Sequence, residues 1–256
     1  MHLNTRFRAA AIALVVTAGI AQAQVSLNYR ESTIIYNYLY GWSTDLHQGN
    51  EEFNDYGLEL TDSMSEGHSG STAGSWGAFS WDAGATGDFS HTYSIAGSLG
   101  DMSSITASGN SVVTNYALED GLAESDSENP GNLLLFRFDV GAATDYTLSA
   151  SYGGVNGGNP TLLRLQRFDG VTWQYVATNL FDGPSGTISS SGTLSAGLYR
   201  MWSEISISSF YSVTNASNGE YEYTLEFAQP VPEPATLAVL GVGIWAVRRR
   251  TQKSKH

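Results

Sequence analysis

The chain has 256 residues, with 12 lysines and arginines against 25 aspartates and glutamates, and it contains no cysteine. Most basic residues lie near the two ends, so residues 24–230 keep five arginines, no lysine and 24 acids, a net charge of −19. Such a charge repels nucleic acid and anionic lipid, which argues against DNA and RNA as partners. The lack of cysteine excludes disulfides, thiolate metal sites and cysteine nucleophiles, so an apolar core must supply the stability.

The first 23 residues have the pattern of a secretory signal peptide. Arg6 and Arg8 precede an apolar run over 9–20, which is about a dozen residues long, whereas a membrane span needs roughly 20. The small residues Ala21 and Ala23 suit cleavage directly after residue 23. We therefore expect export through the secretion translocon and processing by signal peptidase.

The middle of the chain indicates an all-β fold, because short alternating runs rich in Ser, Thr and Tyr recur between turn signals without helical periodicity. In the first half, strands are predicted over Thr33–Trp42, Ser90–Ala96 and Ser103–Leu118. Between them, Glu51–Glu66 is acidic and Gly67–Gly87 is a stretch of Gly, Ser and Ala. These two segments give no clear strand signal.

The second half alternates more clearly. Strands are predicted over Leu133–Val140 and Tyr146–Ala150, and Asp169-Gly170 is predicted to form a two-residue hairpin turn between Leu162–Phe168 and Val171–Ala177. Two later strands place apolar and aromatic residues on one face: Tyr199, Met201, Ser203, Ile205 and Ile207 on the first, and Tyr221, Tyr223, Leu225 and Phe227 on the second. Their opposite faces are predicted to be wet, since they carry Arg200, Glu204, Glu222 and Glu226.

These strands predict one antiparallel, jelly-roll-like β-sandwich over residues 24–230, and segment 121–132 is the best place for a boundary if the region holds two domains. Residues 131–227 resemble the jelly-roll β-sandwiches of bacterial exported proteins, including pre-peptidase C-terminal-like domains. The resemblance rests on an apolar strand before a Tyr-Thr-Leu strand, and on Gly192–Tyr199 leading into a long strand. It implies a fold and no particular activity.

Catalytic patterns are weak, and we expect no enzyme. The middle offers only three histidines, His47, His68 and His91, as a base for a nucleophile. Segment 67–71 departs from the Gly-x-Ser-x-Gly elbow at its last position, where Ser71 stands, and a flexible polar loop is the favoured interpretation there. Among 24 acids some pair always meets the spacing of a glycosidase by chance.

A calcium site is the one metal site that the sequence suggests. Glu124, Asp126 and Glu128 alternate, so their oxygens could converge from an extended loop, and oxygen is the ligand that Ca²⁺ prefers. The segment fails the EF-hand pattern, because Asn129 and Leu135 stand where a glycine and a glutamate belong. A solvated acidic loop is therefore favoured, with no cofactor.

Carbohydrate binding is the main alternative to a purely structural role. Trp42, Trp76 and Trp81 lie in Gly-rich surroundings, and exposed aromatic rings often bind sugars, although rings on strands more often face the core. An exposed cluster of these three rings would favour a sugar site, and a buried cluster would exclude it. The glycosylation pattern at 215–217 is interpreted as a loop.

The C-terminus is organised in three parts. Val231-Pro232-Glu233-Pro234 precedes an apolar segment over 235–247, and Arg248-Arg249-Arg250 follows with further lysines. The 13 apolar residues reach about 20 Å as a helix, short of a hydrocarbon core of about 30 Å, and snorkelling arginines would close much of the gap. The basic end is expected to stay in the cytoplasm.

These parts resemble the PEP-CTERM sorting signal of exported proteins in Gram-negative bacteria. The resemblance implies a short membrane helix, and processing near Pro-Glu-Pro by the membrane transpeptidase exosortase in hosts that typically make exopolysaccharide. We therefore expect an inner-membrane intermediate, followed by release to the cell surface or extracellular matrix. The expected role is a non-catalytic structural or adhesive module; the alternatives are a module that binds exopolysaccharide and a secreted hydrolase with a histidine, a serine and an aspartate in one cleft.

Overall fold

A computed structural model describes residues 24–42, 45–76, 79–119, 122–126, 132–155, 161–178, 185–210 and 215–228, all within one compact unit, Gln24–Ala228. The signal peptide over residues 1–23, the tail from residue 231 and the segment 127–131 lie outside the described residues. Within the described ranges every regular element is a strand, and no helix is long and apolar enough to cross a membrane. The all-β prediction is confirmed.

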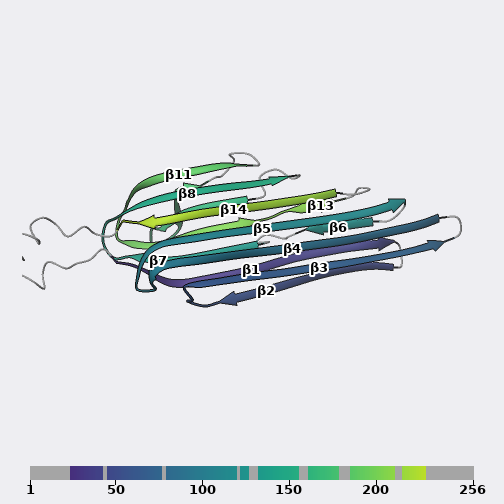
Figure 1. Ribbon diagram of the computed structural model, residues 1–256, viewed down its shortest axis with the longest axis horizontal. Coiled ribbons are helices and arrows are strands. Elements are labelled where there is room, and N and C mark those ends of the chain that lie inside the picture. Colours follow the sequence, from purple (N-terminus) through teal and green to yellow (C-terminus); the bar gives the residue numbers. More distant parts are fainter. Residues whose placement is uncertain are drawn as a thin grey trace, which may run out of the picture. The chain divides into compact units, whose positions relative to one another are not determined.

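The strands form two antiparallel sheets, here called sheet A and sheet B (Figure 1). Sheet A contains β1 (Val25–Trp42), β2 (Asp45–Tyr56), β6 (Leu122–Asp126), β7 (Asn132–Val140), β9 (Thr161–Phe168), β10 (Trp173–Thr178), β12 (Gly197–Ile205) and β13 (Ser208–Phe210). Sheet B contains β3 (Thr61–Trp76), β4 (Phe79–Ser98), β5 (Asp101–Glu119), β8 (Thr144–Val155), β11 (Gly186–Leu194) and β14 (Asn215–Phe227).

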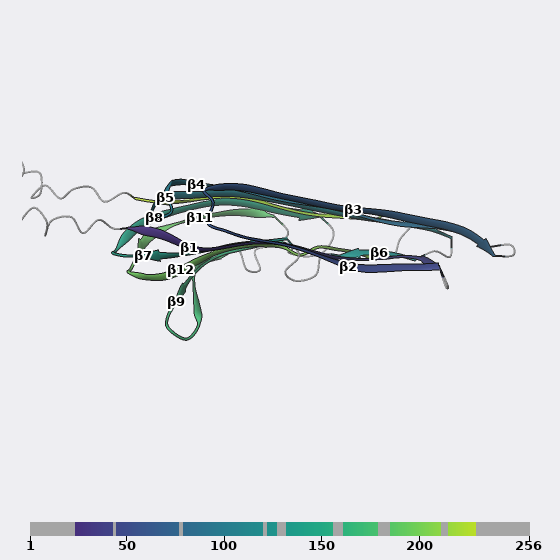
Figure 2. The same cartoon turned by 90° about the horizontal axis from the view of Figure 1, so that it is seen from below.

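The two sheets lie face to face, and the chain crosses between them repeatedly (Figure 2). The strand order in sheet A is β10-β9-β12-β7-β1-β6-β13, and β2 also pairs with β1. The strand order in sheet B is β11-β8-β14-β5-β4-β3. Strands far apart in sequence are neighbours, since β14 pairs with both β5 and β8. This topology confirms the predicted β-sandwich.

The core lies between the sheets and follows the alternation of the sequence. On β14, Tyr221, Tyr223, Leu225 and Phe227 are buried while Glu222 and Glu226 are exposed, as predicted. The predicted inward face of β12 is buried too, and Ile207 joins the core after the strand ends. Aromatic rings join the two sheets: Phe138 lies edge-on to Phe227, with their ring centroids 5.3 Å apart.

Two local predictions, a loop at 67–71 and a loop at 215–217, were wrong. Segment 67–87, without a clear strand signal, lies largely in the long strands β3 and β4, so segment 67–71 is no loop. The pattern at 215–217 opens β14 rather than a loop, and Ser217 is buried. In each case pairing along neighbouring strands, β4 with β5 and β14 with β5, overrides weak local propensity.

The hairpin turn after β9 is longer than predicted, because four residues rather than two separate β9 from β10. Gly170 has the predicted positive φ, at 100°. The Asp169 carboxylate accepts hydrogen bonds from the amides of Val171 and Thr172 and from the side chain of Gln174, and these bonds, that of Thr172 foremost, lower its pKa to about 2. The aspartate therefore shapes this loop.

A buried arginine fastens the crossover from sheet A to sheet B. The Arg30 side chain is fully buried, and its Nη2 lies 2.8 Å from the Asp55 carboxylate of β2 and 2.9 Å from that of Glu59 in the crossover. Its guanidinium lies over the Tyr93 ring of β4, at 5.3 Å from the centroid. Gly57 leaves room for this contact, since a Cβ there would meet both Arg30 and Glu59.

A second polar bridge joins the sheets through β7 and β4. The Asn132 amide donates to the carbonyls of Ser90 and Asn110 and to the Ser111 hydroxyl, which leaves its Oδ1 to accept a hydrogen bond from His91 Nδ1 at 2.6 Å. Both side chains are buried. Burial is the main cause that lowers the pKa of His91.

Candidate ligand-binding face

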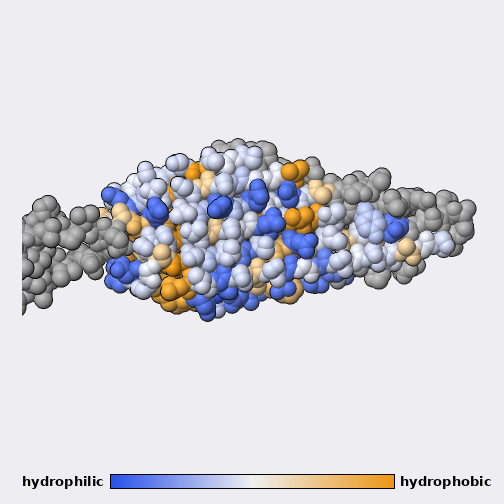
Figure 3. Space-filling view, in the orientation of Figure 1, coloured by the Kyte–Doolittle hydropathy of each residue, from blue (hydrophilic) through white to orange (hydrophobic). Residues whose placement is uncertain are grey.

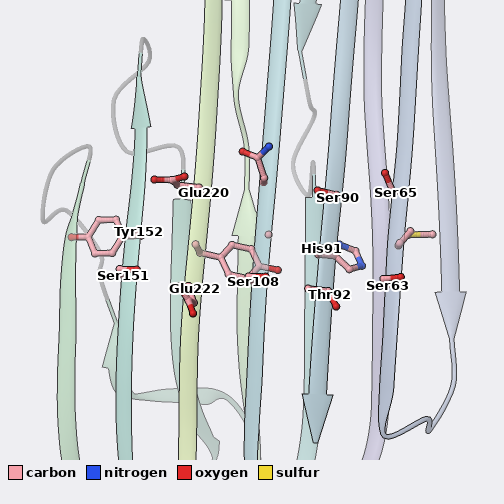
Figure 4. A pocket seen from close by; sticks show the side chains of 14 residues that line it. Ser63, Ser65, Ser90, His91, Thr92, Ser108, Ser151, Tyr152, Glu220 and Glu222 are labelled. Atoms are coloured by element: carbon pink, nitrogen blue, oxygen red, sulfur yellow. The ribbon is translucent and has the colours of Figure 1, made fainter.

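A pocket of about 460 Å³ lies on the outer face of sheet B. Short polar side chains of neighbouring strands line it, among them Ser63, Thr92 and Ser108, with Glu220 and Glu222 from β14 (Figure 4). The surrounding face is mostly pale in hydropathy, with only scattered apolar patches (Figure 3). The pocket offers hydroxyls and carboxylates but no arginine or lysine, and its tyrosines, Tyr152 and Tyr221, are buried.

The predicted histidines do not form a catalytic arrangement in the described part of the chain. His91 borders the pocket, but its side chain is buried and bonded to Asn132. His68 lies on β3 with its Nδ1 3.5 Å from a Glu51 carboxylate oxygen and its ring 5.7 Å from that of Tyr36. The side chain of His47 lies outside the described residues.

The candidate calcium ligands are positioned differently from the prediction. Glu124 and Asp126 lie on β6, paired with β1 and β13, instead of in a solvated loop, because both neighbouring strands complete their backbone hydrogen bonds. Glu128 lies outside the described residues. Within the described ranges, no group of three or more His, Asp and Glu side chains is arranged to hold a metal ion.

The three tryptophans proposed as sugar contacts lie on long strands. Trp42 ends β1 opposite Asp45, Trp76 ends β3 opposite Phe79, and Trp81 lies near the start of β4 opposite Gly74. These strand ends share one end of the sandwich (Figures 1 and 2). Their side chains lie outside the described residues, so their exposure stays a prediction.

Larger polar and aromatic side chains gather on the outer face of sheet A. One row of cross-strand partners runs Tyr175, Gln166, Arg200, Arg137 and Tyr29 over β10, β9, β12, β7 and β1. In the next row Arg164 of β9 lies opposite Trp202 of β12. We call these residues, together with Trp173 of β10, the arginine–tryptophan face. Figure 2 shows β9 and the connection after it bending away from sheet B beside this face.

Arginines and aromatic rings stack on this face. The Arg200 guanidinium lies over the Trp173 ring, 4.4 Å from its centroid, and over the Trp202 ring at 4.9 Å. Its Nε donates to Gln166 Oε1 at 2.7 Å. The Arg137 guanidinium lies over the Tyr29 ring at 4.7 Å. Such cation–π contacts hold both planar groups in place.

Several polar atoms on this face are buried without a partner, namely the Nε atoms of Arg137 and Arg164 and the Oε1 of Glu204. The other oxygen of Glu204 accepts a hydrogen bond from Trp202 Nε1 at 2.8 Å. Burial raises the pKa of the Glu204 carboxyl and lowers that of the Arg200 guanidinium, which Arg137 and Arg164 lower further by repulsion. Buried polar groups without partners cost free energy and are uncommon in folded proteins, so this cluster is unusual.

The predicted wet side of β12 is wrong at Glu204, which is 2 % exposed. The long side chains of Trp202 and its neighbours share this face and shield the carboxyl. This face was not predicted, although the sequence contains a signal for it. Arg200, Trp202 and Glu204 alternate on one strand, and three of the five arginines of residues 24–230 fall on outward positions of apolar strands.

Comparison with known proteins identifies the tail. The model of the PEP-CTERM protein-sorting motif matches residues 230–250, which confirms the predicted signal around Pro232-Glu233-Pro234. No curated protein matches the chain. A solved structure titled "CBM4 structure and function" is similar at 10% sequence identity over 44% of this chain and 75% of that chain, with a TM-score of 0.25, too distant to carry an argument about ligands.

The motif marks the chain as an exported protein with a C-terminal sorting signal that exosortase processes. Its parts, including Val231, the helix predicted over 235–247 and Arg248-Arg249-Arg250, lie outside the described residues. The signal concerns export and sorting. The activity has to be argued from the sandwich.

Proposed function

We propose that this exported protein is a non-catalytic adhesive module of the cell surface or extracellular matrix, and that it adheres by binding carbohydrate on the arginine–tryptophan face. The observation that carries the proposal is the stacked group of Trp173, Arg200 and Trp202. The face combines flat rings, which suit sugar rings, with fixed hydrogen-bonding groups, which suit hydroxyls.

The arrangement is largely preformed. Gln166 holds the Arg200 side chain by a hydrogen bond, and the rings of Trp173 and Trp202 contact its guanidinium. A preformed site loses little conformational entropy when it binds. The pocket on sheet B is less suited to a sugar, because the rings that border it, those of Tyr152 and Tyr221, are buried.

Affinity electrophoresis tests the proposal: the full chain, purified in detergent, migrates through gels that contain the exopolysaccharide of the producing cells. We expect retardation of the wild type and weaker retardation of Trp173→Ala and Trp202→Ala, about tenfold in apparent affinity for the loss of a stacking ring and its supported arginine. Trp76→Ala is the matched control, since it removes a tryptophan of the earlier prediction. Thermal melting of each variant separates lost binding from lost folding.

The outcomes discriminate between the two groups of tryptophans. Loss of retardation in Trp76→Ala with unchanged binding of Trp173→Ala would indicate that the binding site lies at the end of the strands that carries Trp76. No retardation of the wild type by any polysaccharide would contradict carbohydrate binding and leave a purely structural module.

A second experiment tests the sorting step. The intact mass of protein recovered from the cell surface or medium should lack residues 1–23 and the chain near and beyond Pro234. Pro232→Ala with Pro234→Ala should hold the protein unprocessed in the membrane fraction. A recovered mass that extends to His256 would contradict processing by exosortase.

A further inference from the structure

The arginines of the arginine–tryptophan face differ from Arg30 in their ion pairs. Arg137, Arg164 and Arg200 make no ion pair with any carboxylate of the described residues. The buried Arg30, by contrast, has the carboxylates of Asp55, Glu59 and Asp62 within 3.6 Å. Among the described residues, Arg30 thus pairs with three acids, whereas none of these three arginines lies within ion-pair distance of a carboxylate.

The three arginines also repel one another. Arg200 and Arg137 are direct partners across β12 and β7, and like charges in that position destabilise a sheet. Arg164 lies one row away and adds to the repulsion that Arg200 experiences. Departures from a stability rule without local compensation are typical of functional sites.

The acids nearest in the sheet accept hydrogen bonds from neutral side chains and form no close ion pair with these arginines. Glu31 accepts a hydrogen bond from the Tyr29 hydroxyl at 2.9 Å, Asp139 accepts one from Asn28 at 2.8 Å, and Glu204 accepts one from Trp202. The face therefore keeps guanidinium groups that no carboxylate of the described residues approaches within ion-pair distance, although the charge of Glu204 attracts Arg164 at longer range. A ligand that carries negative charge would complete the face.

We propose that the arginine–tryptophan face selects acidic polysaccharide, with Arg137, Arg164 and Arg200 binding the carboxylates of uronic acid residues while the aromatic rings stack on the sugars. This inference rests on the proposed carbohydrate binding and names the class of sugar. A guanidinium presents a planar fork of donors that matches a carboxylate in two parallel hydrogen bonds. Arg200 has its Nε bonded to Gln166, so its terminal nitrogens are aimed by that bond and by the stacked rings.

The rings favour a polysaccharide over an acidic protein or a second copy of this chain. Tyr175 of the same row is 53% exposed, which is unusual for a large ring and suits stacking against a flat ligand. The row of cross-strand partners extends over five strands of sheet A, so the charged groups and the rings are spread along a line across the sheet. A long chain of repeating acidic sugars matches such a line.

The test uses the full chain in detergent and two forms of the producer's exopolysaccharide, native and carboxyl-reduced, in which each carboxylate has become a neutral alcohol. Polygalacturonate and its carboxyl-reduced form serve as a defined second pair. We expect carboxyl reduction to weaken binding about tenfold or more, because charge-assisted hydrogen bonds are lost. Raising the salt concentration should weaken binding of the native polymer only, since salt screens charge and hardly affects stacking.

Single substitutions test which arginines bind the carboxylates of the polymer. Arg137→Gln and Arg164→Gln should each weaken binding of the native polymer about tenfold and weaken binding of the reduced polymer much less, because only the native polymer offers a carboxylate. Arg167→Gln is the matched control: it removes the same charge from β9, but this exposed side chain donates to the Ala196 carbonyl instead. Thermal melting checks that each variant folds.

The results separate this inference from the proposed function. Equal binding of native and reduced polymers would overturn carboxylate selection and leave carbohydrate binding intact. No binding of either polymer would overturn both. Self-association in light scattering that Arg164→Gln abolishes, without polysaccharide binding, would show that the arginines pair with acids of a second copy.

Discussion

The charges around Arg30 are unequally buried, and this asymmetry predicts which substitutions cost more. The Arg30 side chain is 0% exposed, whereas those of Asp55, Glu59 and Asp62 are 44%, 59% and 35% exposed. Neutralising all three acids, as Asp55→Asn, Glu59→Gln and Asp62→Asn, leaves a cation buried without a charged partner. Breaking a buried ion pair in this way costs about 3–5 kcal/mol.

Removing the cation should cost less. Arg30→Met returns three partly exposed carboxylates to water, and the main loss is the donor to the Ser32 hydroxyl and the Gly57 carbonyl, roughly 1–3 kcal/mol. The sharpest expectation is a change of sign: adding Arg30→Met to the triple acid variant should raise its free energy of unfolding, because the unpaired buried charge disappears.

Urea denaturation of the purified chain, followed by tryptophan fluorescence, measures all three variants. The order of stability expected is wild type, then Arg30→Met, then the triple acid variant, with the quadruple variant above the triple one. A triple acid variant more stable than Arg30→Met would refute the reasoning. The unequal burial of the charges would then not decide which substitution lowers the free energy of unfolding more. The hydrogen bond from Arg30 is the main cause that lowers the pKa of Asp55, so this stabilisation should fade as pH falls below the ordinary value of 3.8.

Three further predictions follow from single residues. Burial lowers the pKa of His91 in the folded state, so the free energy of unfolding should fall as pH drops below 6.5, the ordinary pKa. His91→Gln should make the free energy of unfolding, measured by urea denaturation, depend less on pH in this range, and an unchanged pH dependence would contradict the prediction. Asp169→Ala should speed amide exchange in β10, whereas Asp101→Ala, in another turn region, should not. Gly219→Ala should cost about 1–3 kcal/mol in urea denaturation, because its Cβ would lie 2.4 Å from Ile205, whereas Gly192→Ala, at 3.5 Å from Tyr146, should be nearly neutral.

Local patterns in the sequence were sufficient to predict strands of the core and the sorting motif in the tail. Alternation with a period of two is a local property, so the buried face of β14 could be predicted from Tyr221 to Phe227 alone. The PEP-CTERM motif is contiguous and was also predicted from its residues. Local patterns did not predict the strands along Gly67–Gly87, because small residues give a weak strand signal there. These residues form long strands because β3 pairs with β4 and β4 pairs with β5.

Tertiary structure alone decided which strands became neighbours, and with them the candidate site. Arg137, Arg164 and Arg200 come from three strands whose order, β9-β12-β7, depends on how the chain crosses between two sheets. No local period encodes that order, because loops of similar length permit many topologies. Strand order also made β7 a central strand with nearly all of its residues buried, and it brought Glu204 beside Trp202 and out of water. The sequence by itself determined that the protein is exported with a C-terminal sorting signal and which strand faces pack, whereas only the folded sheets placed Arg137, Arg164 and Arg200 on one face.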